Sequence, residues 1–188
     1  MQNWMKIDGW FSPIDTGVNS IIAKNCRPGG TIVVVGVYHG RSTAQLCEEL
    51  RTLGKVDVRI VCVDIYPDDM LEKAKANLEN WHNIEFVKSR SVEASKAFPD
   101  GSIDAVFIDA THNQSGVEAD VKAWLRKVRA GGIISGHDYC STYSGVMEVV
   151  NRRFAGQFAL TGSSWSVTLP VSLSPLKGRI SDEKEQRT

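Results

Sequence analysis

Two aspartates and two histidines stand near the ends of predicted strands, and their side chains suit proton transfer or metal binding. Asp109 and Asp138 each follow a short apolar run, and His112 and His137 lie close to them along the chain. If the two strands are neighbours, they lie about 4.8 Å apart and the two carboxylates converge. Such a pair can hold one hard cation, or one carboxylate can act as a general base whose pKa the other raises. Ordinary polar loops would give the same pattern, so a purely structural reading stays open.

A pair of glycines and one further acid indicate a place for a nucleoside. Gly36 and Gly40 follow the first apolar run, and glycine lets the backbone approach a ligand closely. The helix predicted from Arg41 begins directly afterwards, so its amide end would face that ligand. The pair forms neither the Gly-x-Gly-x-x-Gly dinucleotide fingerprint nor a phosphate-binding loop. Asp64, 28 residues after Gly36, can accept two ribose hydroxyls or can cap the helix that follows it. The two features together predict a nucleoside cofactor across the first two strands.

Alternating strand-like and helix-like hydrophobic patterns must position these residues. Apolar runs predict strands at 31–36, 56–63, 84–87, 103–108 and 133–135. Apolar residues at helical spacing predict one helix that begins near Ser12 and five further helices, over 41–53, 67–81, 92–98, 117–128 and 144–154. Apolar strands that alternate with amphipathic helices indicate an α/β fold, with a mostly parallel sheet and helices on both faces. Ligands of such sheets bind outside the carboxyl ends of the strands, where the polar residues above are expected.

The last part of the chain predicts an antiparallel addition to this sheet. Two short strands, 158–161 and 165–169, are joined by only Gly162-Ser163-Ser164. A link this short permits a hairpin but no crossover helix, so one strand must run antiparallel. We expect a single domain over residues 1–176. The charged segment 177–188 is poor in apolar residues and is expected to be a disordered tail.

Composition narrows the class of partner. The 188 residues contain 22 Lys+Arg and 22 Asp+Glu, a formal net charge of +0. A nucleic-acid partner would call for a marked basic excess, so a small-molecule ligand is favoured. No apolar run approaches the roughly 18 residues of a membrane span, and the first residues lack a signal-peptide pattern. The four cysteines form no C-x-x-C pair, which favours reduced thiols in a cytoplasmic protein.

Aromatic residues precede the first predicted helix. Trp4, Trp10 and Phe11 lie within the first 11 residues, together with Met1 and Met5. They can form a lid over the site, form a contact in a homo-oligomer, or pack under the sheet edge. The sequence leaves these three alternatives open.

Four segments resemble the motifs of class I S-adenosylmethionine-dependent methyltransferases. Residues 32–43, Ile-Val-Val-Val-Gly-Val-Tyr-His-Gly-Arg-Ser-Thr, resemble their first motif, and residues 61–65, Val-Cys-Val-Asp-Ile, resemble their second. Residues 103–112, Ile-Asp-Ala-Val-Phe-Ile-Asp-Ala-Thr-His, resemble their fourth. Residues 130–139, which end in Gly-His-Asp-Tyr, are similar to an element of a subgroup of small-molecule and sugar O-methyltransferases. The resemblance spans roughly residues 15–170.

This resemblance implies a Rossmann-like, seven-stranded sheet of order 3-2-1-4-5-7-6 whose last strand is antiparallel. It also implies contacts between the cofactor S-adenosylmethionine and one set of residues, namely Gly36, Tyr38, Gly40, Ser42, Asp64, Ile65, Ser91 and Asp109. Among these, Asp64 would take the ribose, Ile65 would pack on the adenine, and Ser91 would lie near the adenine edge.

In metal-dependent relatives, the acids at the ends of the fourth and fifth strands hold magnesium. The resemblance therefore implies a Mg²⁺ site at Asp109, His137 and Asp138, although macrolide-tailoring relatives have an acid at the position of His137. The proposed catalytic residues are Asp109, His112 and Asp138. Either His112 or Asp109 would accept the proton of an acceptor hydroxyl, or the metal would lower the pKa of that hydroxyl.

One position departs from the family pattern. Many relatives carry an acid two residues before the first glycine, where it receives the amino group of the cofactor, and this chain has Val34 there. The hypothesis is an S-adenosylmethionine-dependent O-methyltransferase of a small hydroxylated acceptor. The substitution at Val34 keeps a second hypothesis open, a non-catalytic binding or regulatory protein of the same fold. A nicotinamide dehydrogenase is disfavoured because the glycine fingerprint is absent, and a nucleic-acid methyltransferase because no Asn/Asp-Pro-Pro-Tyr/Phe motif occurs.

Overall fold

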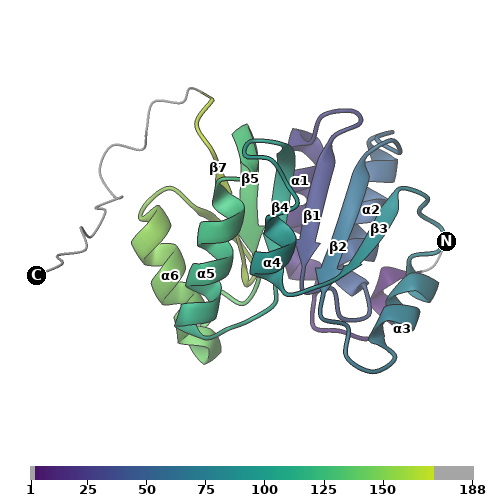
Figure 1. Ribbon diagram of the computed structural model, residues 1–188, viewed down its shortest axis with the longest axis horizontal. Coiled ribbons are helices and arrows are strands. Elements are labelled where there is room, and N and C mark those ends of the chain that lie inside the picture. Colours follow the sequence, from purple (N-terminus) through teal and green to yellow (C-terminus); the bar gives the residue numbers. More distant parts are fainter. Residues whose placement is uncertain (1–2, 172–188) are drawn as a thin grey trace, which may run out of the picture.

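The computed structural model describes residues 3–171, and these form one central sheet with helices around it (Figure 1). The strands are β1 (Thr31–Val35), β2 (Arg59–Asp64), β3 (Ile84–Lys88), β4 (Ile103–Ile108), β5 (Val128–Gly136), β6 (Ala159–Thr161) and β7 (Ser164–Thr168). The α-helices are α1 (Thr16–Asn25), α2 (Arg41–Thr52), α3 (Met70–Asn77), α4 (Ser91–Ser95), α5 (Gln114–Leu125) and α6 (Ser144–Phe154). Short 3₁₀ turns lie at Trp4–Lys6, Pro13–Asp15 and Ser141–Tyr143.

The sheet has seven strands in the order β3-β2-β1-β4-β5-β7-β6, which confirms the predicted topology. Strands β1 to β5 pair in parallel, whereas β7 runs antiparallel to both β5 and β6. Because Thr161 pairs with Ser164, only two residues form the turn between β6 and β7. That short connection is the physical reason for the antiparallel pairing. The predicted tail, 177–188, lies outside the described residues.

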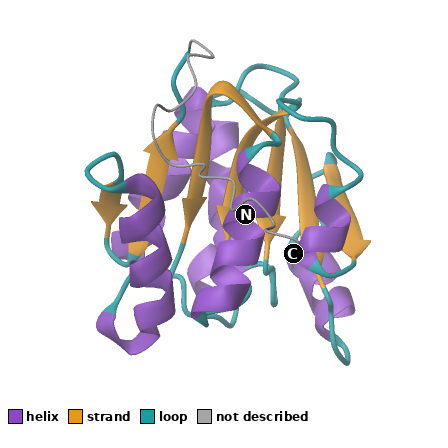
Figure 2. Ribbon diagram, turned by 60° about the vertical axis from the view of Figure 1, so that its left-hand side comes forward, coloured by secondary structure: helices purple, strands orange, loops and turns teal. Residues whose placement is uncertain are grey.

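Each face of the sheet carries its own hydrophobic core. Alternate residues of a strand point to opposite faces, so Ile32 and Val34 face one core while Val33 and Val35 face the other. The first core includes apolar side chains of α1, α2 and α3, and the second includes those of α4, α5 and α6. Figure 2 shows helices in front of the strands and behind them. Burial on both faces explains why the central strands read as continuous apolar runs.

Several predicted boundaries differ from those of the structure, and two of the differences have a clear physical reason. The helix expected over 67–81 is confined to α3, because Asp68 takes a left-handed conformation with φ 52° that breaks the helix before Met70. Val128 continues the helical spacing of α5, yet it pairs with Ile103 and begins β5. Gly131 lies inside β5 with φ 72°, and the register between β4 and β5 is irregular there.

No helix among residues 3–171 is long and apolar enough to cross a membrane. All four cysteines are free thiols; three are buried, and Cys140 is half-buried.

A buried carboxylate anchors the end of the sheet opposite the predicted site. Asp104, near the start of β4, is fully buried and accepts hydrogen bonds from Arg27 Nε at 2.7 Å and Arg129 Nε at 2.8 Å. The backbone amide of Thr31 donates a third, at 3.1 Å. Burial alone would raise the pKa of Asp104, but the hydrogen bonds from the two arginines outweigh it and lower that pKa to about 2.

This pKa predicts an acid-sensitive contribution to stability. The folded-state value lies below the ordinary value of 3.8, so the contribution is complete above pH 4 and is lost as the pH falls through about 2. Its size is about 2 kcal/mol. We expect the free energy of unfolding, measured in urea between pH 5 and pH 2, to fall by about that much more in the wild type than in Asp104→Asn. The same dependence of the free energy of unfolding on pH in the two proteins would contradict the prediction.

Candidate active site

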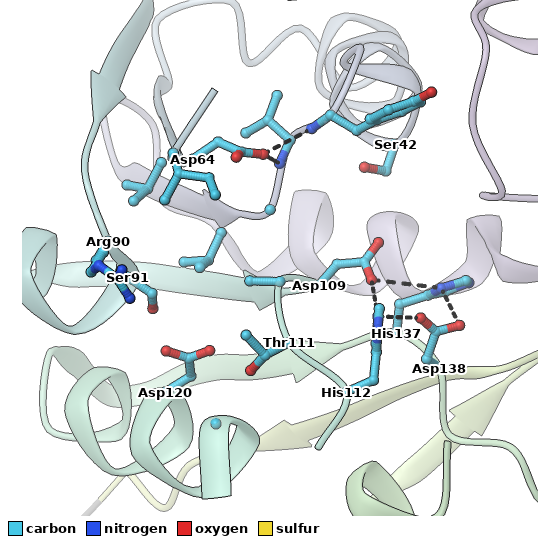
Figure 3. Close-up of a pocket in the computed structure, with 18 of the residues that line it drawn as sticks. Ser42, Asp64, Arg90, Ser91, Asp109, Thr111, His112, Asp120, His137 and Asp138 are labelled. Atoms are coloured by element: carbon cyan, nitrogen blue, oxygen red, sulfur yellow. Dashed lines mark hydrogen bonds and ion pairs between the residues drawn. The ribbon is translucent and has the colours of Figure 1, made fainter. Parts of the chain in front are cut away.

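A cavity of about 750 Å³ opens at the carboxyl ends of β1, β2, β4 and β5. This is the edge at which open parallel sheets bind ligands. With one exception, the residues predicted for the site line this cavity, namely Gly36, Tyr38, Ser42, Asp64, Ile65, Ser91, Asp109, His112, His137 and Asp138. Figure 3 labels seven of them, Ser42, Asp64, Ser91, Asp109, His112, His137 and Asp138. The fold therefore gathers residues that are spread over about a hundred positions of the sequence.

Gly40 is the exception, because it lies behind the cavity at the start of α2. It has φ 87° and precedes the first residue of the helix. A Cβ at this position would lie 2.9 Å from Leu78 Cδ1. The glycine is thus required by the backbone turn and by close packing against Leu78.

The loop between β1 and α2 forms the upper wall of the cavity, and Asp64 fixes its shape. Asp64 Oδ2 accepts hydrogen bonds from the amides of Val37 at 2.7 Å and Tyr38 at 3.0 Å, and Oδ1 accepts one from the amide of Tyr66 at 3.1 Å. A carboxylate offers about four acceptor positions, so about one is left for a ligand hydroxyl. Tyr38 itself takes a left-handed conformation with φ 51°, which this anchoring supports.

The far end of the cavity combines an apolar surface with a buried polar group. The side chain of Ile65 is 57% exposed there and offers a flat apolar contact. Trp124 Nε1 donates to Ser91 Oγ at 2.9 Å. Below it, Asp120 is buried and lies near Ser91 and Thr111, and burial raises its pKa (Figure 3). The sequence analysis missed Asp120, since on helical spacing it reads as an ordinary polar residue of α5.

At the near end, the two predicted aspartates and two histidines form one cluster (Figure 3). His112 Nε2 lies 2.8 Å from Asp138 Oδ2 and 3.8 Å from Asp109 Oδ1. His137 Nδ1 lies 3.1 Å from Asp138 Oδ1 and 4.0 Å from Asp109 Oδ1. Strands β4 and β5 are direct neighbours, as the convergence of the two carboxylates requires.

The backbone at Asp138 lets two consecutive side chains enter the same cavity. In a regular strand, neighbouring side chains point to opposite faces. His137 extends the ladder, since its amide donates to the carbonyl of Ile108 at 3.1 Å. Asp138 then takes a left-handed conformation with φ 62°, which aspartate tolerates better than most residues. The strand end is therefore bent where both side chains are needed.

Mutual interactions set the charge of the cluster. The carboxylates of Asp109 and Asp138 raise the pKa of His112 to about 10. Burial lowers the pKa of His137, but Asp138 and the charges of Asp109 and Asp15 outweigh it and raise the value to about 9. Burial raises the pKa of Asp109, whereas the two histidines hold the pKa of Asp138 well below its usual range. Without a metal ion the carboxylates thus favour the protonated form of both imidazoles, and His137 must release the proton of Nδ1 before that atom can bind a metal.

The same groups fit a divalent cation. Asp109, His137 and Asp138 each offer one ligand atom, and these atoms lie within 4.8 Å of one another. Metal–oxygen bonds of about 2.1–2.5 Å allow three ligands at that spread to converge on one ion with little movement. Two oxygens and one imidazole nitrogen suit magnesium or manganese and, more strongly, the later transition metals.

The N-terminal aromatic residues take two different positions. Trp4 and Phe11 are buried, and Phe11 lies 5.8 Å from the ring of His137. Trp10, in contrast, is 80% exposed and rests 5.3 Å from the ring of Tyr38 on the rim of the cavity. Trp4 and Phe11 therefore pack in the core, whereas Trp10 lies over the site.

Two other lining residues, Tyr143 and Arg41, were not predicted from the sequence. Tyr143 stacks on His112 with ring centroids 4.3 Å apart, and Arg41 lines the cavity beside Ser42. Tyr143 follows the Gly-His-Asp-Tyr element by four residues, so proximity in sequence was the one available indication. Asp15 does not line the cavity but contacts His137 from behind. In the sequence it has the position of an acid in the first turn of a helix, and its neighbours along the chain do not indicate this contact.

Comparison with known proteins gives one family and one fold. The family described as a methyltransferase domain matches residues 33–139. Among solved structures, similar chains include an S-adenosylmethionine-dependent O-methyltransferase from Thermotoga maritima, with 14% identity, TM-score 0.64 and coverage of 88% of this chain and 68% of that one. An rRNA methylase from Streptococcus thermophilus has 14% identity and TM-score 0.65, over 87% of this chain and 99% of that one.

A TDP-rhamnose 3′-O-methyltransferase of calicheamicin biosynthesis has 13% identity and TM-score 0.62, over 81% of this chain and 76% of that one. At these identities the structural likeness concerns the fold. No curated protein matches the sequence.

Proposed function

The chain belongs to the methyltransferase-domain family and is an S-adenosylmethionine-dependent methyltransferase, and from this premise we propose that it methylates a hydroxyl oxygen of a small molecule. The observation that carries the proposal is the cluster of Asp109, His112, His137 and Asp138 beside a wall suited to a nucleoside. Oxygen methylation needs a group that removes the hydroxyl proton, and this cluster supplies several. We take residues 1–176 as the single domain that does so.

The cofactor has a natural orientation in the cavity. Its methionine part would lie along the loop of Gly36 and Tyr38, near Ser42, and its ribose would use the remaining acceptor position of Asp64. The adenine would pack on Ile65 beneath Ser91. The methyl group would then point toward Asp109, which ends the strand next to β1. Val34 is buried in the first core, so the amino group of the cofactor would need backbone carbonyls or Asp109 as its partner.

Methyl transfer is an in-line displacement. The acceptor oxygen forms a bond to the methyl carbon, the carbon–sulfur bond breaks, and S-adenosylhomocysteine leaves as a neutral thioether. The hydroxyl proton passes to Asp109, whose pKa is raised by burial. His112 is the weaker candidate for this step because its raised pKa keeps it protonated. It would instead hold Asp109 and Asp138 in place, and the alignment of oxygen, carbon and sulfur supplies much of the rate.

Magnesium is the second part of the proposal. Asp109, His137 and Asp138 would hold the ion, which when bound would lower the pKa of an acceptor hydroxyl. The Gly-His-Asp-Tyr element, residues 136–139, supports a place in the subgroup of small-molecule and sugar O-methyltransferases. A sugar O-methyltransferase and an rRNA methylase share the fold equally well, and the balanced charge of this chain favours the small acceptor.

Binding and turnover test the proposal directly. We expect S-adenosylhomocysteine to bind in calorimetry, and a labelled methyl group to pass from S-adenosylmethionine to a member of a panel of phenols, sugars and nucleotide sugars. Asp64→Ala should lose the binding, because it removes both the loop anchor and the ribose acceptor. Methyl transfer to RNA oligonucleotides, with none to the panel, would overturn the small-molecule assignment.

Removal of divalent ions tests the metal separately. We expect treatment with EDTA to reduce methyl transfer at least 10-fold, and added Mg²⁺ or Mn²⁺ to restore it, because three ligand atoms converge on one point. Binding of S-adenosylhomocysteine should change little, since most of its assigned contacts lie on the loop of Gly36 and Tyr38 and on Asp64, and of these contacts only Asp109 is also a metal ligand. Activity that is indifferent to EDTA would assign the chemistry to Asp109 and its histidine partners alone.

A further inference from the structure

The ring of His137 is contacted on its far side by two residues outside the matched family region, 33–139. Its Nε2 atom lies 3.0 Å from Ser163 Oγ and 3.4 Å from Asp15 Oδ2. Its other nitrogen, Nδ1, faces Asp138 and Asp109. Each imidazole nitrogen has its own partner, and in a histidine the partner of one nitrogen determines what the other can do.

Asp15 is held rigidly for this contact. The residue is 2% exposed, and its Oδ1 accepts hydrogen bonds from the amide of Ser163 at 2.8 Å and from the hydroxyl of Ser163 at 3.1 Å. Its Oδ2 accepts one from the amide of Ser12 at 3.1 Å and a short one from the Ser12 hydroxyl. Burial raises the pKa of Asp15, but the hydrogen bonds from Ser12 and Ser163 and the charge of His137 outweigh it and lower the pKa. The group is a fixed anion.

The turn between β6 and β7 is shaped to reach this carboxylate. Gly162 has φ 61°, and a Cβ at that position would overlap Asp15 Oδ1. Glycine is therefore needed both for the backbone conformation and for the close approach of the turn. The neighbouring Ser163 is thereby placed between Asp15 and His137.

We propose that Asp15, together with Ser163, is a positioning residue that keeps the proton of His137 on Nε2 and aims Nδ1 at Asp109 and Asp138. This inference rests on the proposed function, because it assigns the support of the same site. Carboxylates that accept from the second nitrogen of a metal-binding histidine fix its tautomer and its orientation, and their loss typically lowers metal affinity 10–100-fold. Ser163 Oγ is the hydrogen-bond partner of His137 Nε2, at 3.0 Å, and donates to Asp15 Oδ1, so Asp15 acts on His137 through Ser163 and through its own charge at 3.4 Å.

A structural role must be separated from a positioning role, because Asp15 also closes the capping box with Ser12. Ser12→Ala is the matched control, since it removes only the hydroxyl hydrogen bond of the cap, while the amide of Ser12 and both hydrogen bonds from Ser163 still hold Asp15 beside His137. Asp15→Asn keeps the shape and removes the charge. Asp15→Glu and Ser163→Ala provide further variants if Asp15→Asn fails to fold.

The first readout is the ¹⁵N spectrum of histidine rings in the full-length protein, without metal. We expect the Nε2–H signal of His137 to be present and protected from exchange in the wild type and in Ser12→Ala. In Asp15→Asn it should shift upfield or broaden, and Asp15→Glu should restore it in part. An unchanged His137 signal in a folded Asp15→Asn protein would overturn the proposal.

The second readout is the affinity for Mn²⁺, measured by electron paramagnetic resonance. We expect Asp15→Asn to bind Mn²⁺ 10–100-fold more weakly than the wild type, and Ser12→Ala to bind it normally. If Asp15→Asn and Ser12→Ala lose Mn²⁺ affinity equally, Asp15 acts only as part of the capping box and the proposal is overturned. The affinity for S-adenosylhomocysteine is measured in parallel. If the wild type does not bind S-adenosylhomocysteine, the proposed function is refuted. If the wild type binds it and Asp15→Asn keeps the wild-type affinity for Mn²⁺, only this inference is refuted.

Discussion

Replacing Asp138 with asparagine is expected to lower methyl transfer at least about 100-fold while S-adenosylhomocysteine affinity stays within about twofold. The carboxylate contacts both histidines of the cluster and offers one of three converging ligand atoms. Asparagine is neutral, so it neither balances the imidazolium charges nor binds a hard cation well. It also tolerates the left-handed conformation at this position, so the fold should survive.

Asp68→Asn is the matched control for this variant. Asp68 has a similar left-handed conformation, φ 52°, but it is exposed and does not line the cavity. Its activity should equal that of the wild type. Full activity of Asp138→Asn, measured with the same labelled donor, would remove the cluster from the mechanism.

Replacing Gly36 with alanine is expected to cost roughly 3–5 kcal/mol of stability and to abolish binding of the methyl donor. Gly36 has φ 82°, and a Cβ there would overlap the carbonyl of Asp109. The strain of the conformation adds to the clash, so either the loop or the end of β4 must move. Both carry residues assigned to the donor. The free energy of unfolding in urea and calorimetry with S-adenosylhomocysteine measure the two effects.

Gly54→Ala separates the two contributions. Gly54 has a comparable φ of 70°, but no atom lies within 4 Å of the position that its Cβ would take. It should cost about 1–2 kcal/mol, the price of the conformation alone, and leave donor binding unchanged. Equal destabilisation of the two variants would show that the contact between Gly36 and Asp109 is not tight.

Local patterns were sufficient for much of the fold. The bounds of β4 and α6 agree with the prediction, and the short link after β6 correctly required an antiparallel strand. Val128 shows where such patterns fail. It follows Trp124 and Leu125 at helical spacing, and only its pairing with Ile103, which is far away in sequence, makes it part of a strand.

The site could be predicted where strand ends determine it. Asp109 and Asp138 converge because β4 and β5 are neighbours, a strand order that the family resemblance implied. The anchoring of the loop by Asp64 was not predictable, since it depends on which way two amides point. The contact of Asp15 with Ser163 was not predictable either, because the two residues are 148 positions apart and neither lies in one of the segments that resemble the family motifs.

The sequence separation of Asp15 and Ser163 has a consequence for the order in which parts of the protein fold. A growing polypeptide can assemble β1 to β5, and with them the wall for the nucleoside, before its final hairpin has been synthesised. The closure that joins Ser163 to Asp15 comes last and spans most of the chain, and contacts of such range form slowly. Until β6 and β7 are in place, His137 therefore has its contacts with Asp138 and Asp109 but lacks the hydroxyl of Ser163 at Nε2.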